Sequence, residues 1–448
     1  MTTPFSNFAP DASDLLNFTH DVSNVLPGET SYRPAKSIAA LTPTAADARI
    51  TGIVGTDTSG GTKYVFAGNA SKIYQLQGQT LTDKSKTGGY STASGERWIF
   101  VVFGNTILAS NYSDPIQAWQ IGTSTAWADL SGTPPKARAM ATVRDFLVTG
   151  DIIESSVAYE NRVRWSAIGD ETNWTIGTST QSDFQTIFDG GNVQAITGGE
   201  FGLILCKRSI TRMDYVGSPL IFQFDQIAAN RGLAARDAVT RVGATTYWLD
   251  HDGFYSFDGA KINPIGFGKV NRFFWDDVKR SALDRTTCAA DPINGLICWS
   301  YVSNSSTEPD RVLVYNYRVD RWAKFDEDHT LIGQLVTPDT TLEELDSVDP
   351  QLDDHTVSFD AAVYRGGDLQ LATATTDHKI ATFSGPTLGA SIDTPEAALA
   401  GARKALVRGV RPVVTGGTLT AQIASRDRNK VLLSPTPITP KQIEPSGM

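Results

Sequence analysis

Residues 286–326 read TTCAADPINGLICWSYVSNSSTEPDRVLVYNYRVDRWAKFD. Within this stretch, DPING at Asp291–Gly295 predicts a tight turn, because proline fixes φ and Asn-Gly accepts positive φ. The segments around the turn are rich in β-branched and aromatic residues, and Arg311–Tyr317 alternates with the two-residue period of a strand. We therefore expect four short antiparallel strands, at 286–290, 296–301, 311–317 and 321–325.

Such a small sheet cannot bury both of its faces alone, so it needs similar sheets stacked beside it, as in the blades of a β-propeller. Similar units recur along the chain as an aliphatic strand, a polar loop and a strand carrying an aromatic residue. Seven units carry that aromatic, at Tyr74, Trp119, Trp165, Tyr215, Tyr255, Tyr315 and Phe383. Most spacings match the roughly 40 to 50 residues of known propeller repeats, and polar insertions lengthen the last two.

An all-β sandwich is the alternative, since turns recur there as well. The propeller is favoured for two reasons. A sandwich does not need the same aromatic position seven times, and a sandwich of about 250 residues is near the size limit of a single domain. The sequence thus predicts an all-β, seven-bladed β-propeller over residues 46–387. An extended N-terminal arm precedes it at 1–45, and a C-terminal β extension with an irregular tail follows at 388–448.

The segments outside the repeats leave alternatives open. Residues 1–45 are rich in Ser, Thr, Asn and Pro, which fits either an arm lying on the propeller or a neighbour, or a disordered tail. Residues 405–424 are expected to form a hairpin, whereas 394–402 is compatible with a helix or with irregular structure. Residues 268–279 show helical spacing of apolar residues and predict one short helix packed on a blade edge.

The charge, the apolar runs and the cysteines of the chain disfavour several classes of protein. The net charge is −10, which argues against a module that binds DNA without sequence preference, but not against a surface that DNA slides past. The start of the chain lacks a secretory signal pattern, and no apolar run is long enough to span a membrane. Three cysteines in strand patterns favour buried, reduced thiols, at Cys206, Cys288 and Cys298.

Known catalytic patterns are missing from the sequence: there is no Gly-x-Ser-x-Gly, His-Glu-x-x-His or phosphate-binding loop. Asp250–Gly253, DHDG, is the best candidate for a metal or acid site, although Asp-Gly between two strands favours a hairpin turn. The acidic run 339–355 favours a solvated loop, because it lacks the ligand spacing of a cation site. The histidines stand alone and are expected in turns or on the surface, at His20, His251, His329, His355 and His378.

We therefore assign no catalytic, cofactor-binding or metal-binding residue, and expect neither an enzyme nor a cofactor.

A set of turn-and-strand motifs carries a resemblance to a known family. It consists of Asn24–Pro27, Arg162–Ala167 followed by Gly169, Asp170 and Trp174, Tyr255–Gly259, Asp291–Tyr301, Val314–Tyr317 with Arg321 and Trp322, and Leu406–Pro412. Over residues 12–425 the chain resembles the tail-hub, or packaged-DNA-stabilisation, propeller proteins of short-tailed bacteriophages.

The resemblance implies a virion structural protein of the head-to-tail connector or tail hub, assembled in the host cytoplasm. Such proteins form a homo-oligomeric ring, usually a hexamer, next to a portal or adaptor ring. They retain packaged DNA, which passes the lumen without sequence-specific binding, and they anchor a tail needle, nozzle or fibres. A negatively charged lumen repels the DNA backbone, so DNA can leave without binding to it. For the subunit edges of the ring we expect the N-terminal arm and the C-terminal hairpin, with a propeller that folds without residues 1–30.

Two other functions are weighed against this one. A carbohydrate-active or glycan-binding propeller of a phage tail would require three or more carboxylates facing one pocket beside exposed aromatic residues. A cellular scaffold of the kelch type is disfavoured, since the repeats here are too divergent for a kelch signature.

Overall fold

The computed structural model describes residues 5–13, 16–57, 63–336 and 369–395, with short pieces at 413–414, 420–423 and 436–437. The stretch that opened the sequence analysis forms one antiparallel sheet of four strands: β25 (Thr287–Asp291), β26 (Leu296–Tyr301), β27 (Arg311–Asn316) and β28 (Arg321–Asp326). The DPING turn joins the first two strands, and Gly295 has a φ of 70°, which glycine adopts without strain. The expected four-stranded unit is confirmed.

Seven sheets of this kind make the chain a seven-bladed β-propeller, as the sequence predicts. The first three blades are β5 (Gly52–Asp57), β6 (Lys63–Gly68), β7 (Ile73–Gln77) and β8 (Thr80–Asp83); β9 (Ile99–Phe103), β10 (Thr106–Ser110), β11 (Gln117–Gln120) and β12 (Ala128–Asp129); and β13 (Lys136–Val143), β14 (Phe146–Glu154), β15 (Val157–Trp165) and β16 (Asp183–Thr186). The fourth and fifth are β17 (Val193–Thr197), β18 (Gly202–Cys206), β19 (Ser209–Gly217) and β20 (Ile221–Ala229); and β21 (Val239–Val242), β22 (Thr245–Asp250), β23 (Gly253–Phe257) and β24 (Ile262–Pro264). The sheet described above is the sixth.

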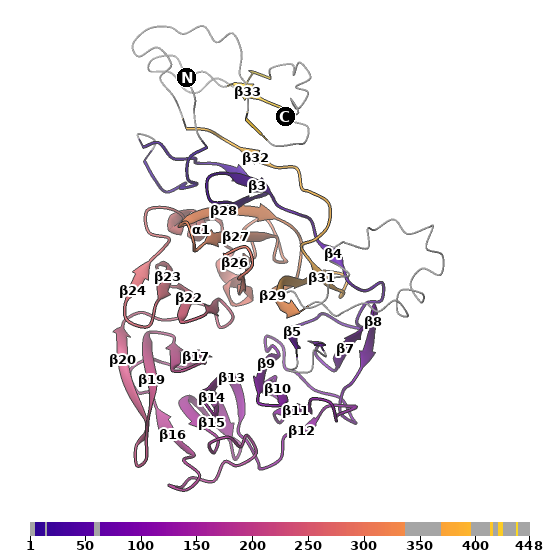
Figure 1. Ribbon diagram of the computed structural model, residues 1–448, viewed down its shortest axis with the longest axis vertical. Coiled ribbons are helices and arrows are strands. Elements are labelled where there is room, and N and C mark those ends of the chain that lie inside the picture. Colours follow the sequence, from indigo (N-terminus) through magenta and orange to yellow (C-terminus); the bar gives the residue numbers. More distant parts are fainter. Residues whose placement is uncertain are drawn as a thin grey trace. The chain divides into compact units, whose positions relative to one another are not determined.

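The seventh blade closes the ring with both ends of the propeller sequence. It contains β29 (Leu331–Val336), β30 (Leu369–Ala374), β31 (Ile380–Thr382) and, as its fourth strand, β4 (Ala39–Ala40). Ala40 pairs with Ala381 and Ala39 with Thr382 (Figure 1). The first strand of each blade contacts the first strand of the next, and β29 contacts β5, so the ring is continuous. The expected boundary between residues 45 and 46 therefore separates β4 from the blade to which it belongs.

The recurring aromatic residues share one structural position. Six of the seven lie on the third strand of their blade, and Phe383 directly follows the third strand of the seventh blade. Tyr74, Trp119, Trp165, Tyr255 and Tyr315 are buried, because the third strand packs between neighbouring blades. This shared position explains the periodicity in the sequence.

The N-terminal segment lies on the propeller, which decides between the two alternatives for the arm. β1 (Val22–Ser23) pairs with β32 (Ser391–Ile392), and β2 (Val25–Pro27) forms a hairpin with β3 (Tyr32–Pro34) that contacts β28. The Asp326 amide donates a hydrogen bond to Asn24 Oδ1 at 2.9 Å. Phe8, Val22 and Val25 are buried in the same core cluster as the residues of blades four to six.

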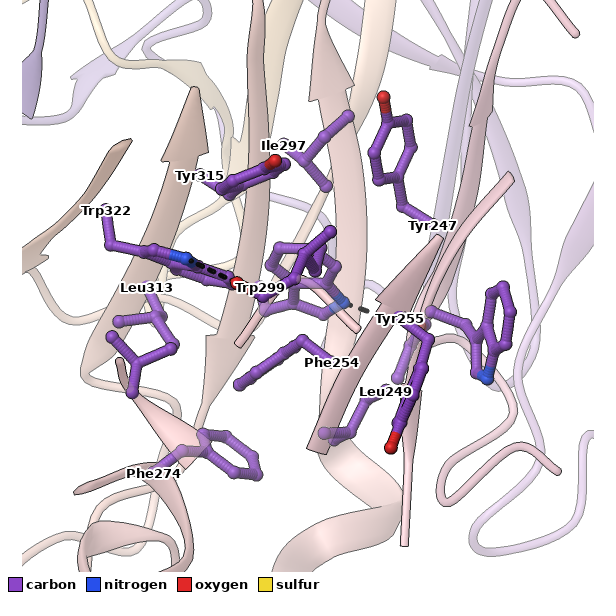
Figure 2. Packing of buried hydrophobic residues seen from close by; sticks show 14 of the residues in the cluster. Tyr247, Leu249, Phe254, Tyr255, Phe274, Ile297, Trp299, Leu313, Tyr315 and Trp322 are labelled. Carbon is purple, nitrogen blue, oxygen red and sulfur yellow. Dashed lines mark hydrogen bonds between the residues drawn. The ribbon is translucent and has the colours of Figure 1, made fainter. Parts of the chain in front are cut away.

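That core cluster is rich in aromatic residues, as Figure 2 shows. Trp299 and Trp322 stack with ring centroids 5.7 Å apart, and Phe254 packs against both. The Trp322 indole donates a hydrogen bond to the Ile265 carbonyl at 3.1 Å. Buried indole N–H groups of this kind usually need such a partner.

The expected helix is confirmed as α1 (Asn271–Asp277), whose Phe274 is buried against Phe254 and Tyr301. A 3-10 helix, Arg280–Arg285, follows it. The part of the chain that the structure describes contains no helix long and apolar enough to cross a bilayer.

Within the described residues of the C-terminal part, β33 (Gln422–Ile423) pairs with β34 (Thr436–Pro437), and β32 pairs with β1 as given above. The hairpin expected over 405–424 and the open segment 394–402 lie almost wholly outside the described residues, as do the motif Leu406–Pro412 and the acidic run 339–355.

Candidate functional site

The first strands of the blades surround the propeller axis and run in the same direction, so the channel that they line has two different ends. Residues that precede the first strands gather at one end, and the turns between first and second strands gather at the other. Each end holds a distinct set of side chains.

The first end is crossed by charged side chains, which we call the charged bridge: Glu96, Arg97, Arg138, Asp151, Arg236 and Asp237. Glu96 and Arg97 precede the first strand of blade two, and Arg236 and Asp237 precede that of blade five. Arg236 pairs with Glu96 at 2.7 Å, and Arg97 pairs with Asp237 at 3.0 Å. Blades two and five lie three steps apart in a ring of seven, so these ion pairs join opposite sides of the propeller.

Glu96 is the centre of the charged bridge. It also pairs with Arg138 of β13 at 2.9 Å, and Arg138 continues to Asp151 of β14 at 3.1 Å. Burial acts to raise the pKa of Glu96, but the hydrogen bonds from Arg236 and Arg138 outweigh it and hold that pKa below its ordinary value. Burial raises the pKa of Asp151, whose Oδ1 has no hydrogen-bond partner.

The charged bridge leaves little open space. The hollow between its side chains, beside Ile99 and Tyr112, has a volume of about 10 Å³, the size of one water molecule. A related group of charges lies at the same end, where Glu308 pairs with Arg49 at 2.7 Å and with Arg285. Ion pairs therefore cross this end of the channel.

The second end opens as a funnel with a volume of about 950 Å³. Its lining comes from the first strands of blades two to five and from the turns that follow the first strands of blades three to five. The lining residues are Phe100, Val101, Met140, Ala141, Thr142, Arg144, Ile196, Thr197, Gly198, Gly199, Glu200, Phe201, Arg241, Gly243 and Ala244.

Hydrogen bonds between neighbouring turns build the rim of this funnel. The Arg144 amide donates to the Gly199 carbonyl at 2.8 Å, and the Gly199 amide donates to the Thr142 carbonyl at 2.9 Å. The Arg241 guanidinium donates to the carbonyls of Gly198 and Phe201, which links blade five to blade four. Backbone hydrogen bonds and the Arg241 side chain therefore fix the rim across three blades.

Asp250–Gly253, the sequence candidate for a metal or acid site, is the hairpin turn between β22 and β23. Burial raises the pKa of Asp250, whose Oδ1 accepts a hydrogen bond from the His251 amide at 2.6 Å. The His251 ring contacts the Lys207 carbonyl at 2.9 Å, and the Tyr255 hydroxyl donates to Asp252. No group of three potential metal ligands occurs among the described residues, here or elsewhere.

The expectation for the histidines is wrong for His329, which is fully buried. Its Nδ1 donates to the Glu327 carbonyl at 2.6 Å, and its Nε2 accepts from the Ser300 hydroxyl at 2.5 Å. Burial lowers the pKa of His329 to about 4. His378 lies in the turn between β30 and β31, and His355 is outside the described residues.

The three cysteines are free thiols: Cys206 and Cys298 are buried and Cys288 is partly exposed. Cys288 pairs with Trp299 and Cys298 with Ala289, so the two cysteines are not direct cross-strand partners.

Sequence reasoning found neither the charged bridge nor the funnel. Four of its charged residues precede a strand and read as parts of solvated loops, whereas Arg138 and Asp151 lie within β13 and β14. Only the recurrence of Arg-Asp or Glu-Arg pairs just before first strands, at Glu96–Arg97 and Arg236–Asp237, offered a signal.

No protein-family model matches the chain, and no curated protein matches it. Among solved structures it is similar to the computationally designed Ika8 protein, with 12% identity over 77% of this chain and 98% of that one, and a TM-score of 0.39. It is also similar to the WD40 domain of Pan2 from Neurospora crassa, with 8% identity over 79% of this chain and 96% of that one, and a TM-score of 0.44. Likeness at this level says nothing about what the chain binds.

Proposed function

We propose that this chain is a non-enzymatic structural subunit of a bacteriophage head-to-tail connector or tail hub. In this role, copies of the chain form a ring that retains packaged DNA and anchors distal tail parts. The motifs that resemble tail-hub proteins support it, since those within the described residues lie in one compact unit, residues 4–395. The net charge of −10 fits a ring past which DNA slides.

The observation that carries the proposal is the distribution of exposed apolar side chains. Phe188 is 81% exposed and Leu220 is 73% exposed, and Ile176 and Val216 are about half exposed. All four lie on blades three and four, as do the exposed Val157, Ile168 and Phe184, whereas Phe267 and Ile293 are exposed outside these two blades. The N-terminal segment covers blade six and closes blade seven. Exposed apolar side chains that gather on one part of a surface favour a contact with another protein, whereas single ones do not. Blades three and four are therefore the proposed ring contact.

This assignment changes the expected subunit edges. Phe8, Val22 and Val25 of the N-terminal segment are buried in the core of their own chain. These side chains are therefore not available to contact a neighbouring subunit. The exposed tip of the β19–β20 hairpin, with Val216 and Leu220, takes the place of the arm as a subunit edge.

Mass photometry of the purified chain, alone and mixed with portal and adaptor proteins, tests the proposal. We expect a ring, or a monomer that becomes a ring only on the portal or adaptor complex. Leu220→Ser combined with Phe188→Ser should abolish that ring, because the contact loses its apolar anchors. Lys261→Ser, on the turn before β24, is the surface control and should assemble normally. A persistent monomer that ignores these partners would refute the proposal.

The glycan-binding alternative receives no specific support from the two hollows described above. The funnel holds one carboxylate, Glu200, and the hollow at the charged bridge holds Glu96 and Asp237, both paired with arginine. A glycan screen would follow only if the chain stays monomeric with its expected partners.

A further inference from the structure

The funnel is positively charged in a protein whose net charge is −10. Its lining contains two arginines, Arg144 and Arg241, and one acidic residue, Glu200. Glu200 is 90% exposed and lies 3.9 Å from Arg144, which makes this a weak, solvated pair. The funnel is therefore one place where this acidic molecule attracts an anion.

Arg241 carries most of that attraction. Among the described residues it donates only to backbone carbonyls: those of Gly198 and Phe201, and that of Gly243 at 2.8 Å. Partial burial lowers the pKa of its guanidinium, and no carboxylate of the described chain offsets this effect. The side chain stays charged at neutral pH, because an arginine pKa starts far above that range. Its charge is held at a fixed place on the rim and is not neutralised there.

The floor beside these arginines is apolar. Phe100, Val101, Met140, Ala141 and Ile196 line it from blades two, three and four. Phe201 is buried between two guanidiniums, with Arg241 4.7 Å and Arg212 4.4 Å from its ring centroid. The site thus offers a fixed cation next to a surface of mainly aliphatic side chains.

This pairing distinguishes between classes of ligand. Sugars are held by exposed aromatic faces and many directional hydrogen bonds, whereas Phe201 is covered by arginines and the rest of the floor is mainly aliphatic. A nucleic acid needs a continuous basic track, which Glu200 interrupts. A peptide supplies both parts of the match, because an apolar side chain fits the floor and a carboxylate accepts the charge-assisted hydrogen bonds of arginine.

We propose that the funnel is a docking site for an extended peptide segment of a neighbouring protein, carrying a glutamate or aspartate beside an apolar side chain. The volume of about 950 Å³ is large enough for several residues of such a segment. The carboxylate lies between Arg241 and Arg144, and the apolar side chain covers Val101, Met140 and Ile196. This inference rests on the proposed function only in that the virion structure supplies the neighbour.

Fluorescence anisotropy with labelled hexapeptides tests the site in the full-length protein. The probes are acetylated, amidated peptides in which one glutamate is flanked by leucine and phenylalanine. The matched controls carry glutamine in place of glutamate, or serine in place of both apolar residues. We expect the glutamate peptides to bind and both controls to bind at least about tenfold more weakly, as for the loss of one charge-assisted hydrogen bond or one apolar anchor.

Variants locate the binding. Arg241→Gln and Arg144→Gln should each weaken the glutamate peptides about tenfold, and added salt should weaken them in the parent protein. Arg144→Gln keeps the test valid if Arg241→Gln disturbs the rim, because the contacts of the Arg144 side chain with Glu200 and Tyr215 are weak and partly exposed. Arg272→Gln makes the same charge change on the exposed surface of α1 and should leave binding unchanged.

Equal binding of glutamate and glutamine peptides, or no binding of either, would overturn the inference. Binding of an acidic oligosaccharide at the funnel, lost in Arg241→Gln, with no peptide binding, would also overturn it. Mass photometry of the same variants separates the two proposals. Ring formation without peptide binding rejects the docking site alone, and peptide binding without ring formation rejects the ring function alone.

Discussion

At the scale of single residues, buried polar groups show where the surroundings of a side chain differ from what its sequence neighbours indicate. His329 follows Asp326, Glu327 and Asp328, so the sequence reads as an exposed acidic loop. In the fold it is enclosed between blades six and seven and hydrogen-bonded through both ring nitrogens. Burial of a residue in a loop depends on which blade packs against it, and local sequence does not contain that information.

The buried neutral imidazole predicts an acid-dependent loss of stability. Its pKa of about 4 lies below that of the unfolded chain, near 6.5, so the unfolded state binds more protons between these values. The contribution is complete above pH 6.5 and is lost as the pH falls towards 4. Protonation should cost about 1.4 kcal/mol per pH unit in this window, up to roughly 3 kcal/mol.

Urea denaturation of the parent protein and of His329→Gln at pH 7 and pH 4.5 measures this contribution. We expect the parent to lose more stability between the two pH values than the variant does. His251→Gln, which changes a histidine in an exposed turn, should behave like the parent. An identical pH dependence in the parent and in His329→Gln would contradict the explanation.

At the scale of elements, the blades could be predicted from the sequence, but the strand that closes the seventh blade could not. The turn Asp291–Gly295 and the third-strand aromatics have strong local signals, because a tight turn and a buried aromatic position each restrict residue type. β4 consists of Ala39 and Ala40, which carry no strand periodicity. Its pairing with β31 joins residues more than three hundred positions apart, and only the geometry of the closed ring determines it.

The N-terminal segment is an integral part of the propeller core, so its loss should destabilise the fold. Phe8 is buried, and its ring lies 5.9 Å from that of Phe273. Phe8→Ala should cost about 3 kcal/mol of unfolding free energy through lost burial and the cavity that remains. Phe267→Ala removes a ring that is 78% exposed and should cost less than about 0.5 kcal/mol. Urea denaturation compares the two.

A chain that lacks residues 1–30 should for the same reason be less stable than the full chain, even if the propeller folds without them as the sequence predicts. Faster proteolysis of the truncated chain would agree with this. Equal midpoints for Phe8→Ala and Phe267→Ala would mean that the N-terminal segment contributes little to the core.

At the scale of the whole molecule, two devices hold the ring together: the closure of blade seven and the charged bridge across the axis. The closure acts around the circumference, and the bridge joins blades two, three and five directly. Only 11% of the Glu96 side chain is exposed, and it faces two arginines. Removing its charge leaves both arginines without their shared partner, and breaking a mostly buried pair in this way costs about 3 kcal/mol.

Glu96→Gln should therefore lower the unfolding free energy by about that amount, measured by urea denaturation. Because Glu96 has a lowered pKa, its contribution is present above the carboxylate's ordinary pKa and disappears as the pH falls below it, so the variant and the parent should converge in acid. Asp276→Asn removes a carboxylate from an exposed pair on α1 and should cost no more than about 0.5 kcal/mol. If Glu96→Gln were no more harmful than Asp276→Asn, the ion pairs across the axis would not be holding the ring.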